Sequence, residues 1–182
     1  MQQSPDLVDA ARAQLQGLIG TSTRGAQDLL DRFDRWGGDL VEALAEIYPI
    51  ETALPQLIEV MAAAHLQRDE SLQQRDRERV LEQDWFQSPE TIGYVAYADL
   101  FAKNLKGIAK RIPYLENLGV TYLHLLPILK PRPGANDGGY AVMDYRALRE
   151  DLGSMKELRS TADKLHDSGI SLTLDRVVAG LP

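Results

Sequence analysis

The stretch GANDGGYAVMDYRAL, residues 134–148, places a carboxylate and an aromatic ring on either side of two glycines. Asp137 precedes Gly138 and Gly139, and Tyr140 follows them. Glycine tolerates positive φ and adds no side chain, so this turn leaves open space between the acid and the ring. A carboxylate can bind sugar hydroxyls or an arginine, and a tyrosine ring can stack on the apolar face of a pyranose. The spacing alone also fits an Asx-turn, in which Asp137 bonds its own backbone and Tyr140 packs inside the loop.

Other common chemistries find no support in the residue pattern. The chain has no cysteine, and its three histidines, His65, His124 and His166, fall in different expected elements without ligand spacing. His124 lies among apolar residues, and we expect it to be a hydrogen-bonded core residue. No serine elbow, P-loop or dinucleotide fingerprint occurs. We therefore expect no metal site and no cofactor.

Composition narrows the class of partner. The 182 residues carry a formal net charge of -7, which provides no basic stripe for phosphates, so nucleic acid is not an expected partner. No apolar run approaches the roughly 18 residues that cross a bilayer, so no membrane contact is expected. The start, MQQSPDLVDAARAQ, lacks the basic and apolar regions of a signal peptide. The expected location is the cytoplasm.

The first half of the chain, residues 1–84, has helical periodicity throughout and is expected to form a small helical domain. Ser4 and Pro5 fit the cap and first turn of one helix. A second helix is expected to stop at Gly37 and Gly38. A third is expected to begin near Thr52 and to continue through QRDESLQQRDRER, residues 67–79, a charged stretch that can bury almost nothing.

The second half, residues 85–182, alternates between strands and helices. Runs rich in apolar residues predict strands near 92–97, 121–126 and 170–175. Residues 104–118 predict a helix between the first two strands, and Ser154 with Glu157 predicts a capping box before a further helix. The middle strand is apolar nearly throughout, as expected when a strand is covered on both faces. Strand, helix, strand, helix, strand is the order of right-handed parallel crossovers.

This order predicts where a ligand binds, because α/β folds bind ligands beyond the carboxyl ends of their strands. The long loop ILKPRPGANDGGYAVMDY, residues 128–145, follows the second strand, and Asp175 ends the third. Loops this long are more often functional than shorter ones. Asp137, Tyr140 and Asp175 are therefore expected near the same edge of the sheet.

Three stretches, TIGYVAYADLFAKNLKGIAKRIPYLENLGVTYLHLLPILK, NDGGYAVMDYRALREDLGSMKELR and LHDSGIS, resemble amylosucrases, which are members of the α-amylase superfamily (glycoside hydrolase family 13). The resemblance covers most of residues 84–175, and the helical first half is similar to the helical domain that precedes the barrel in amylosucrases. It implies glucosyl transfer from sucrose to an α-1,4-glucan by a retaining mechanism, with release of fructose. Sucrose and α-glucan are thus the implied partners, and no nucleotide sugar or redox cofactor is implied.

The resemblance also implies roles for individual residues. Asp137 matches the aspartate that pairs with an arginine at the floor of the glucosyl pocket, and Tyr140 matches the aromatic platform under the ring. Asp175 matches the aspartate that ends the third barrel strand. Where amylosucrases continue with Asn-His, whose imidazole binds the glucosyl unit, this chain has Ala179 and Gly180.

The expected fold is α/β: a helical N-terminal domain followed by the first three β/α units of an incomplete (β/α)8 TIM barrel, a fold of about 250 residues. Retaining chemistry needs two carboxylates roughly 5 Å apart, which amylosucrases carry after later strands, so no catalytic residue is assigned. The chain is expected to be inactive alone and to self-associate through the open barrel edge. Two alternatives stay open: a non-catalytic helical interaction module, and one half of a split enzyme.

Overall fold

The computed structural model describes residues 4–175 and divides the chain into two compact units, residues 1–83 and 84–182. In the first unit the described residues from 4 onward form four helices and no strand: α1 (Ser4–Ile19), α2 (Ala26–Ala45), α3 (Ile50–Leu66) and α4 (Glu70–Leu81). The second unit combines short helices with two sheets. None of the described helices is both long enough and apolar enough to cross a membrane.

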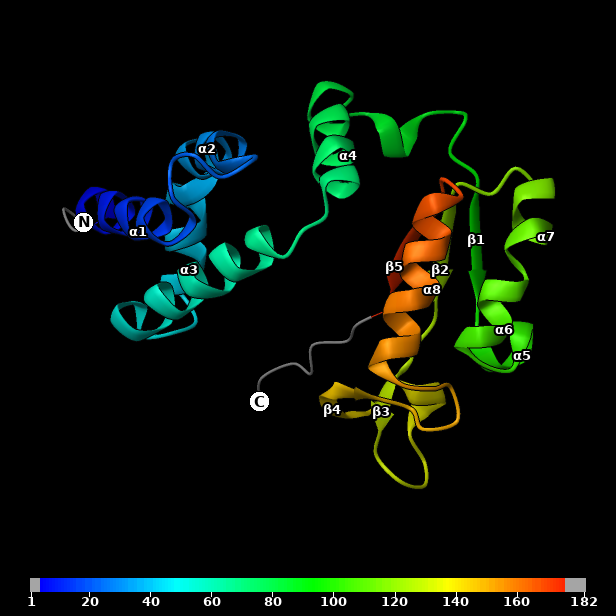
Figure 1. Cartoon of the computed structure of the whole chain (residues 1–182). Helices are drawn as coiled ribbons and strands as arrows, with labels where there is room; N and C mark the ends of the chain where they lie inside the picture. Colours follow the sequence, from blue (N-terminus) through cyan, green and yellow to red (C-terminus); the bar gives the residue numbers. More distant parts are fainter. Residues whose placement is uncertain (1–3, 176–182) are drawn as a thin grey trace. The chain divides into compact units, whose positions relative to one another are not determined.

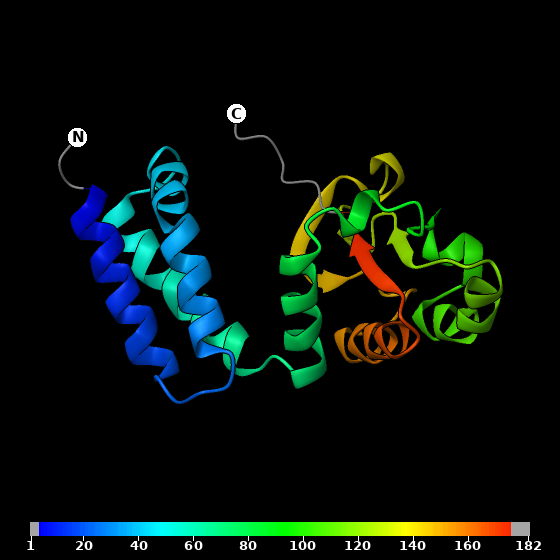
Figure 2. The same ribbon diagram turned by 90° about the horizontal axis from the view of Figure 1, so that it is seen from above.

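Helices α1, α2 and α3 pack against one another around one apolar core (Figures 1 and 2). Each contributes one stripe of side chains at helical spacing, which is how an amphipathic helix buries its apolar face. Leu15 of α1 and Ile58 of α3 are fully buried, and Phe33 of α2 is nearly so. This core holds α1, α2 and α3 together.

Two expectations for the helical unit are wrong. Helix α2 does not stop at Gly37 and Gly38 but continues to Ala45, because Val41 is buried beyond the glycines and holds the next turn on the core. The expected long third helix is two helices, α3 and α4, separated by residues 67–69. Helix α4 buries no residue, so no core contact holds it in line with α3. The charged stretch buries as little as its composition predicts.

In the second unit, β1 (Gly93–Ala96), β2 (Tyr122–Leu125) and β5 (Ser171–Leu174) form one parallel sheet in the order β1-β2-β5. The predicted parallel arrangement of the three strands in sequential order is therefore confirmed. Their register aligns Tyr94, Leu123 and Leu172 in one row and Val95, His124 and Thr173 in the next. Adjacent rows point to opposite faces of the sheet.

Only one face of this sheet is covered by the described residues. Leu123 and Leu125 of β2 are fully buried toward the helices, whereas His124 is half-buried on the opposite face and Val95 is 58% exposed there. The expectations that β2 is covered on both faces and that His124 is a core residue are thus wrong for residues 4–175. The open face is the one that turns inward in a closed barrel. Self-association through it stays a prediction.

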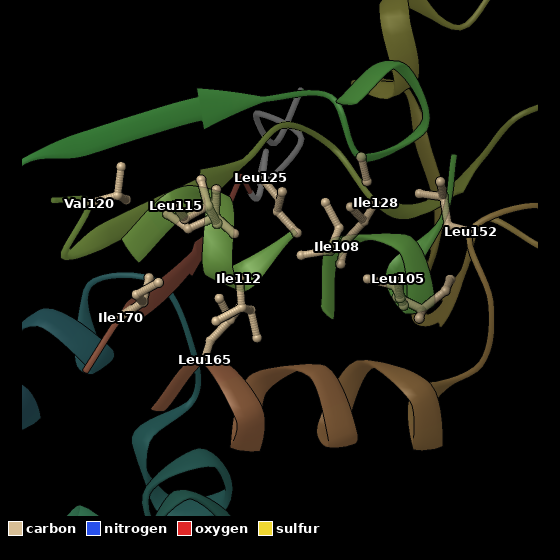
Figure 3. Packing of buried hydrophobic residues seen from close by; sticks show 13 residues of the cluster. Leu105, Ile108, Ile112, Leu115, Val120, Leu125, Ile128, Leu152, Leu165 and Ile170 are labelled. Atoms are coloured by element: carbon tan, nitrogen blue, oxygen red, sulfur yellow. The ribbon is translucent and has the colours of Figure 1, made fainter. Parts of the chain in front are cut away.

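The covered face packs against α6 (Leu105–Lys110), α7 (Ile112–Asn117) and α8 (Met155–Asp167) (Figure 3). The side chains labelled in Figure 3 form one cluster drawn from these helices, the sheet and the loops between them. The capping box of Ser154 and Glu157 is confirmed: each side chain bonds the backbone of the other. The outer helices lie on the face opposite to the open one, where the apolar cluster holds them.

The single helix expected over 104–118 is also wrong. The segment forms two helices, because α6 ends at Lys110 and α7 begins at Ile112. A further short helix, α5 (Ala98–Ala102), precedes them. Pro113 has no N–H to donate to the carbonyl of Ala109, so the regular ladder cannot continue through it. The N–H of Arg111 contacts the carbonyl oxygens of both Gly107 and Ile108, which tightens the last turn of α6.

The long loop after β2 contains an antiparallel hairpin that the sequence analysis did not predict. Its strands are β3 (Leu129–Pro131) and β4 (Val142–Leu148), paired at Leu129 with Leu148 and at Pro131 with Val142. Leu148 is 6% exposed and belongs to the core cluster, so the hairpin is anchored on the second unit. The hairpin carries a short 3-10 turn, η2 (Asp137–Gly139), at its tip.

Candidate sugar-binding site

Turn η2 lies close against the carboxyl ends of the parallel strands, and its two glycines make that approach possible. A Cβ atom on Gly138 would lie 3.1 Å from the hydroxyl oxygen of Tyr97, and one on Gly139 would lie 3.3 Å from Cβ of Pro127. Tyr97 directly follows β1. Both glycines have positive φ, at 66° and 96°, a conformation that glycine tolerates without strain.

The Asx-type bond in this turn is made by Asn136, not by Asp137. The Asn136 side chain accepts a hydrogen bond from the backbone N–H of Gly139 at 3.0 Å. Asp137 itself has a positive φ of 50° and an exposed side chain. Among the described residues, no hydrogen bond or ion pair reaches its carboxylate. Its carboxylate is therefore available to a ligand.

Tyr140 and Asp175, 35 positions apart in the chain, are joined directly. The Tyr140 hydroxyl donates to Oδ2 of Asp175 at 2.7 Å, and both side chains are half-buried. This bond, followed by desolvation and the negative charge of Asp175, raises the pKa of Tyr140 to about 12. The Asp175 backbone N–H bonds the carbonyl of Leu125, which extends the pairing of β5 with β2 and fixes the carboxylate at the strand end.

A second cluster ties helix α5, which follows β1, to the residues directly after β4. The Arg149 guanidinium contacts Asp99 at 2.8 Å and Asp151 at 2.7 Å. Hydrogen bonding to Arg149 lowers the pKa of both aspartates and pairing with them raises that of Arg149. Beside the bridge, a cavity of about 280 Å³ is lined by Tyr97, Asn136, Arg149 and neighbouring residues. The bridge thus holds the backbone that carries Tyr97 next to the backbone that carries η2.

The structure brings Tyr140 and Asp175 into contact, and the negative charge of Asp137, three positions before Tyr140, is the smallest of the causes that raise the Tyr140 pKa. Sequence analysis missed Tyr97 and Asn136, although Tyr97 stands at a strand end, the position that identified Asp175. Ala179 and Gly180 lie outside the described residues. Among the residues that are described, no group of three or more histidines or carboxylates could hold a metal ion. The arrangement offers a carboxylate, tyrosine hydroxyls and an aromatic ring at one sheet edge, which are groups that bind a sugar.

The model of the alpha-amylase catalytic domain family matches residues 69–180 of this chain. The chain belongs to this family. Its second unit therefore forms part of an α-amylase catalytic domain, and the three parallel strands are a partial TIM-barrel-like sheet.

Curated relatives lie within the same group of carbohydrate enzymes. The 1,4-alpha-glucan branching enzyme of Gloeobacter violaceus is 36% identical over 98 residues, 54% of this chain and 12% of the relative. The oligo-1,6-glucosidase of Parageobacillus thermoglucosidasius is 35% identical over 75 residues, 41% of this chain and 13% of the relative. A solved structure of trehalose-6-phosphate hydrolase from Bacillus licheniformis is also similar, with 26% sequence identity and a TM-score of 0.45. The similar region is 52% of this chain and 18% of the hydrolase chain. The chain thus spans about an eighth of these two curated relatives.

Proposed function

We propose that residues 84–175 form one wall of the glucosyl pocket of an amylosucrase-like glucosyltransferase that uses sucrose as donor. Membership of the alpha-amylase family supports glycoside hydrolase or transferase chemistry. The observation that carries the finer proposal is the juxtaposition of Asp137, Tyr140 and Asp175 at the carboxyl ends of the strands. The helical unit before the barrel segment is the second element that we assign to the amylosucrase pattern.

Each of the three residues has a role in this proposal. The exposed Asp137 carboxylate pairs with an arginine or accepts hydrogen bonds from glucosyl hydroxyls. Tyr140 presents its ring to the apolar face of the sugar, and the bond from its hydroxyl to Asp175 fixes the ring's orientation. These residues bind and orient the glucosyl unit. They do not form or break the glycosidic bond, which needs a nucleophile and an acid/base carboxylate.

An exchange protein tests the proposal. Residues 84–175 replace the corresponding segment of an amylosucrase, whose own later strands supply the catalytic carboxylates. We expect fructose release from sucrose and formation of α-1,4-glucan. A folded exchange protein that cleaves maltose or isomaltose but not sucrose would reject sucrose as donor and leave only the broader family chemistry.

A matched pair of variants asks whether Asp137 acts at the site. In the exchange protein, Asp137→Asn should lower kcat/KM for sucrose. Asp144→Asn, in the hairpin strand β4, should not, because the Asp144 carboxylate bonds the backbone N–H of Arg146 at 2.8 Å and lies outside the turn. Equal losses in both variants would assign Asp137 only a structural role.

A further inference from the structure

The helical unit contains a cavity that the proposed function does not use. Its volume is about 360 Å³, within the range of small-ligand pockets, and its lining comes mainly from α2 and α4, with His65 of α3. We propose that this cavity binds a neutral sugar, namely a short α-glucan. The cavity chemistry selects the neutral polyhydroxy ligand, and the choice of α-glucan rests on the proposed function.

The charges of the cavity wall are largely neutralised within the wall. Arg68 contacts Asp76 through two nitrogens, at 2.7 and 2.8 Å, and Arg77 contacts Asp28 at 3.3 Å. The lining as a whole holds four arginines and three aspartates. Two of the four arginines are paired in this way, and the formal charge of the lining is only +1. Such a wall keeps directional donors and acceptors with a small net field, so it favours a ligand with many hydroxyls over a phosphate.

One acceptor in this wall has no partner. Oε1 of Gln73 is buried and receives no hydrogen bond from any described residue, whereas Nε2 of the same side chain donates to the carbonyl of Arg68 at 3.2 Å. A buried acceptor without a donor is costly. A ligand hydroxyl that donates to Gln73 Oε1 removes this cost.

Gly25 keeps the space next to this acceptor open. Its φ is 71°, and a Cβ atom there would lie 3.1 Å from Gln73 Oε1 and 3.1 Å from Cε1 of His65. His65 is 7% exposed, and its Nε2 lies 3.1 Å from the carbonyl oxygen of Arg24, so Nε2 carries the hydrogen. The wall is therefore held in place by buried contacts at the point where the unpaired acceptor lies.

The rim of the cavity supplies the apolar part of a sugar site. Val80 and Leu81, at the end of α4, are 46% and 85% exposed and line the opening. Aliphatic side chains can cover the C–H face of a pyranose while the polar wall bonds its hydroxyls. The volume fits one or two glucose units.

Saturation-transfer NMR on the 182-residue chain with maltotriose tests this proposal. We expect binding by the unmodified chain. Gln73→Met, which removes the buried acceptor at similar side-chain length, should weaken binding about five- to tenfold, as expected for one lost hydrogen bond. The control Gln14→Met, on α1 and outside the cavity, should bind as the unmodified chain does.

Several results would overturn the proposal: no transfer to maltotriose, equal binding by the Gln73→Met and unmodified chains, or displacement of maltotriose by millimolar inorganic phosphate. Circular dichroism confirms that each variant keeps its helical content. The exchange protein described above contains residues 84–175 only. Failure of the cavity to bind maltotriose therefore contradicts only the cavity proposal and not the proposed function. Failure of the exchange protein contradicts only the proposed function, because maltotriose binding through Gln73 is measured on the 182-residue chain.

Discussion

The bond between Tyr140 and Asp175 gives a direct spectroscopic prediction. It is the largest cause of the rise in the Tyr140 pKa, from an ordinary 10.0 to about 12. Asp175→Ala removes both the acceptor and its charge, so the pKa should fall back toward 10. Asp175→Asn keeps an acceptor but removes the charge, so its effect should lie between the two.

At pH 11 the difference is large enough to read from a single spectrum. A tyrosine with a pKa of about 12 is about one tenth ionised at this pH, whereas one with a pKa of about 10 is about nine tenths ionised. The chain has seven tyrosines. Selective ¹³Cζ labelling separates their resonances, and the resonance that Tyr140→Phe removes is the one to follow.

The same bond sets the sign of a stability effect at high pH. Because the folded-state pKa of Tyr140 is raised, the bond stabilises the fold below pH 10, and this contribution is lost as pH rises toward about 12. The unmodified chain should therefore lose its stability advantage over Asp175→Ala across this range. A Tyr140 that titrates near 10 in the unmodified chain, or one that Asp175→Ala leaves unchanged, would refute the reasoning.

Three further predictions concern the fold and the chain's activity. Gly38→Ala should raise the free energy of unfolding by up to about 1 kcal/mol in chemical denaturation, because nothing lies within 4 Å of the added Cβ. Gly37→Ala should lack this gain, because its Cβ would lie 2.9 Å from the ring of Phe33. Equal gains in the two variants would contradict this packing. Arg149→Met should lower the free energy of unfolding by about 1–3 kcal/mol at pH 7. The difference between this variant and the unmodified chain should shrink below pH 3.8, because Asp99 and Asp151, whose pKa values Arg149 lowers, then become protonated. A difference in stability that does not change with pH would argue against the bridge. The 182-residue chain tested alone should release no fructose from sucrose above a buffer blank, and sustained release surviving repurification would overturn the missing-carboxylate argument.

The sheet could be predicted because its strands are apolar runs separated by helices, and sequential parallel crossovers leave little freedom in strand order. Helix ends were less predictable. Gly37 and Gly38 resemble a stop signal in the sequence, but burial of Val41 continues the helix past them. Pro113 broke a pattern whose apolar spacing otherwise fits one helix. In both cases tertiary packing or one missing N–H outweighed local periodicity.

The position of the site could be predicted because ligands bind at the carboxyl ends of parallel strands. Tyr140 and Asp175 were placed at the same edge by topology, and the structure adds the hydrogen bond between them. The hairpin that carries Tyr140 was not foreseen, since Pro131 within a three-residue strand gives almost no strand signal. The Asx-turn that the spacing left open as an alternative for Asp137 is made by Asn136, because both side chains are suited to it and only the backbone geometry separates them.

The central claim is that Tyr140, held by Asp175, orients a glucosyl unit at the carboxyl ends of the strands. Its most direct test is kcat/KM for sucrose in the exchange protein with and without Tyr140→Ala. Loss of the ring and of its bond should lower kcat/KM at least about a hundredfold, the scale on which misplaced substrates lose reactivity. A folded Tyr140→Ala exchange protein with kcat/KM within about threefold of its parent, a free-energy difference under about 0.7 kcal/mol, would contradict the account.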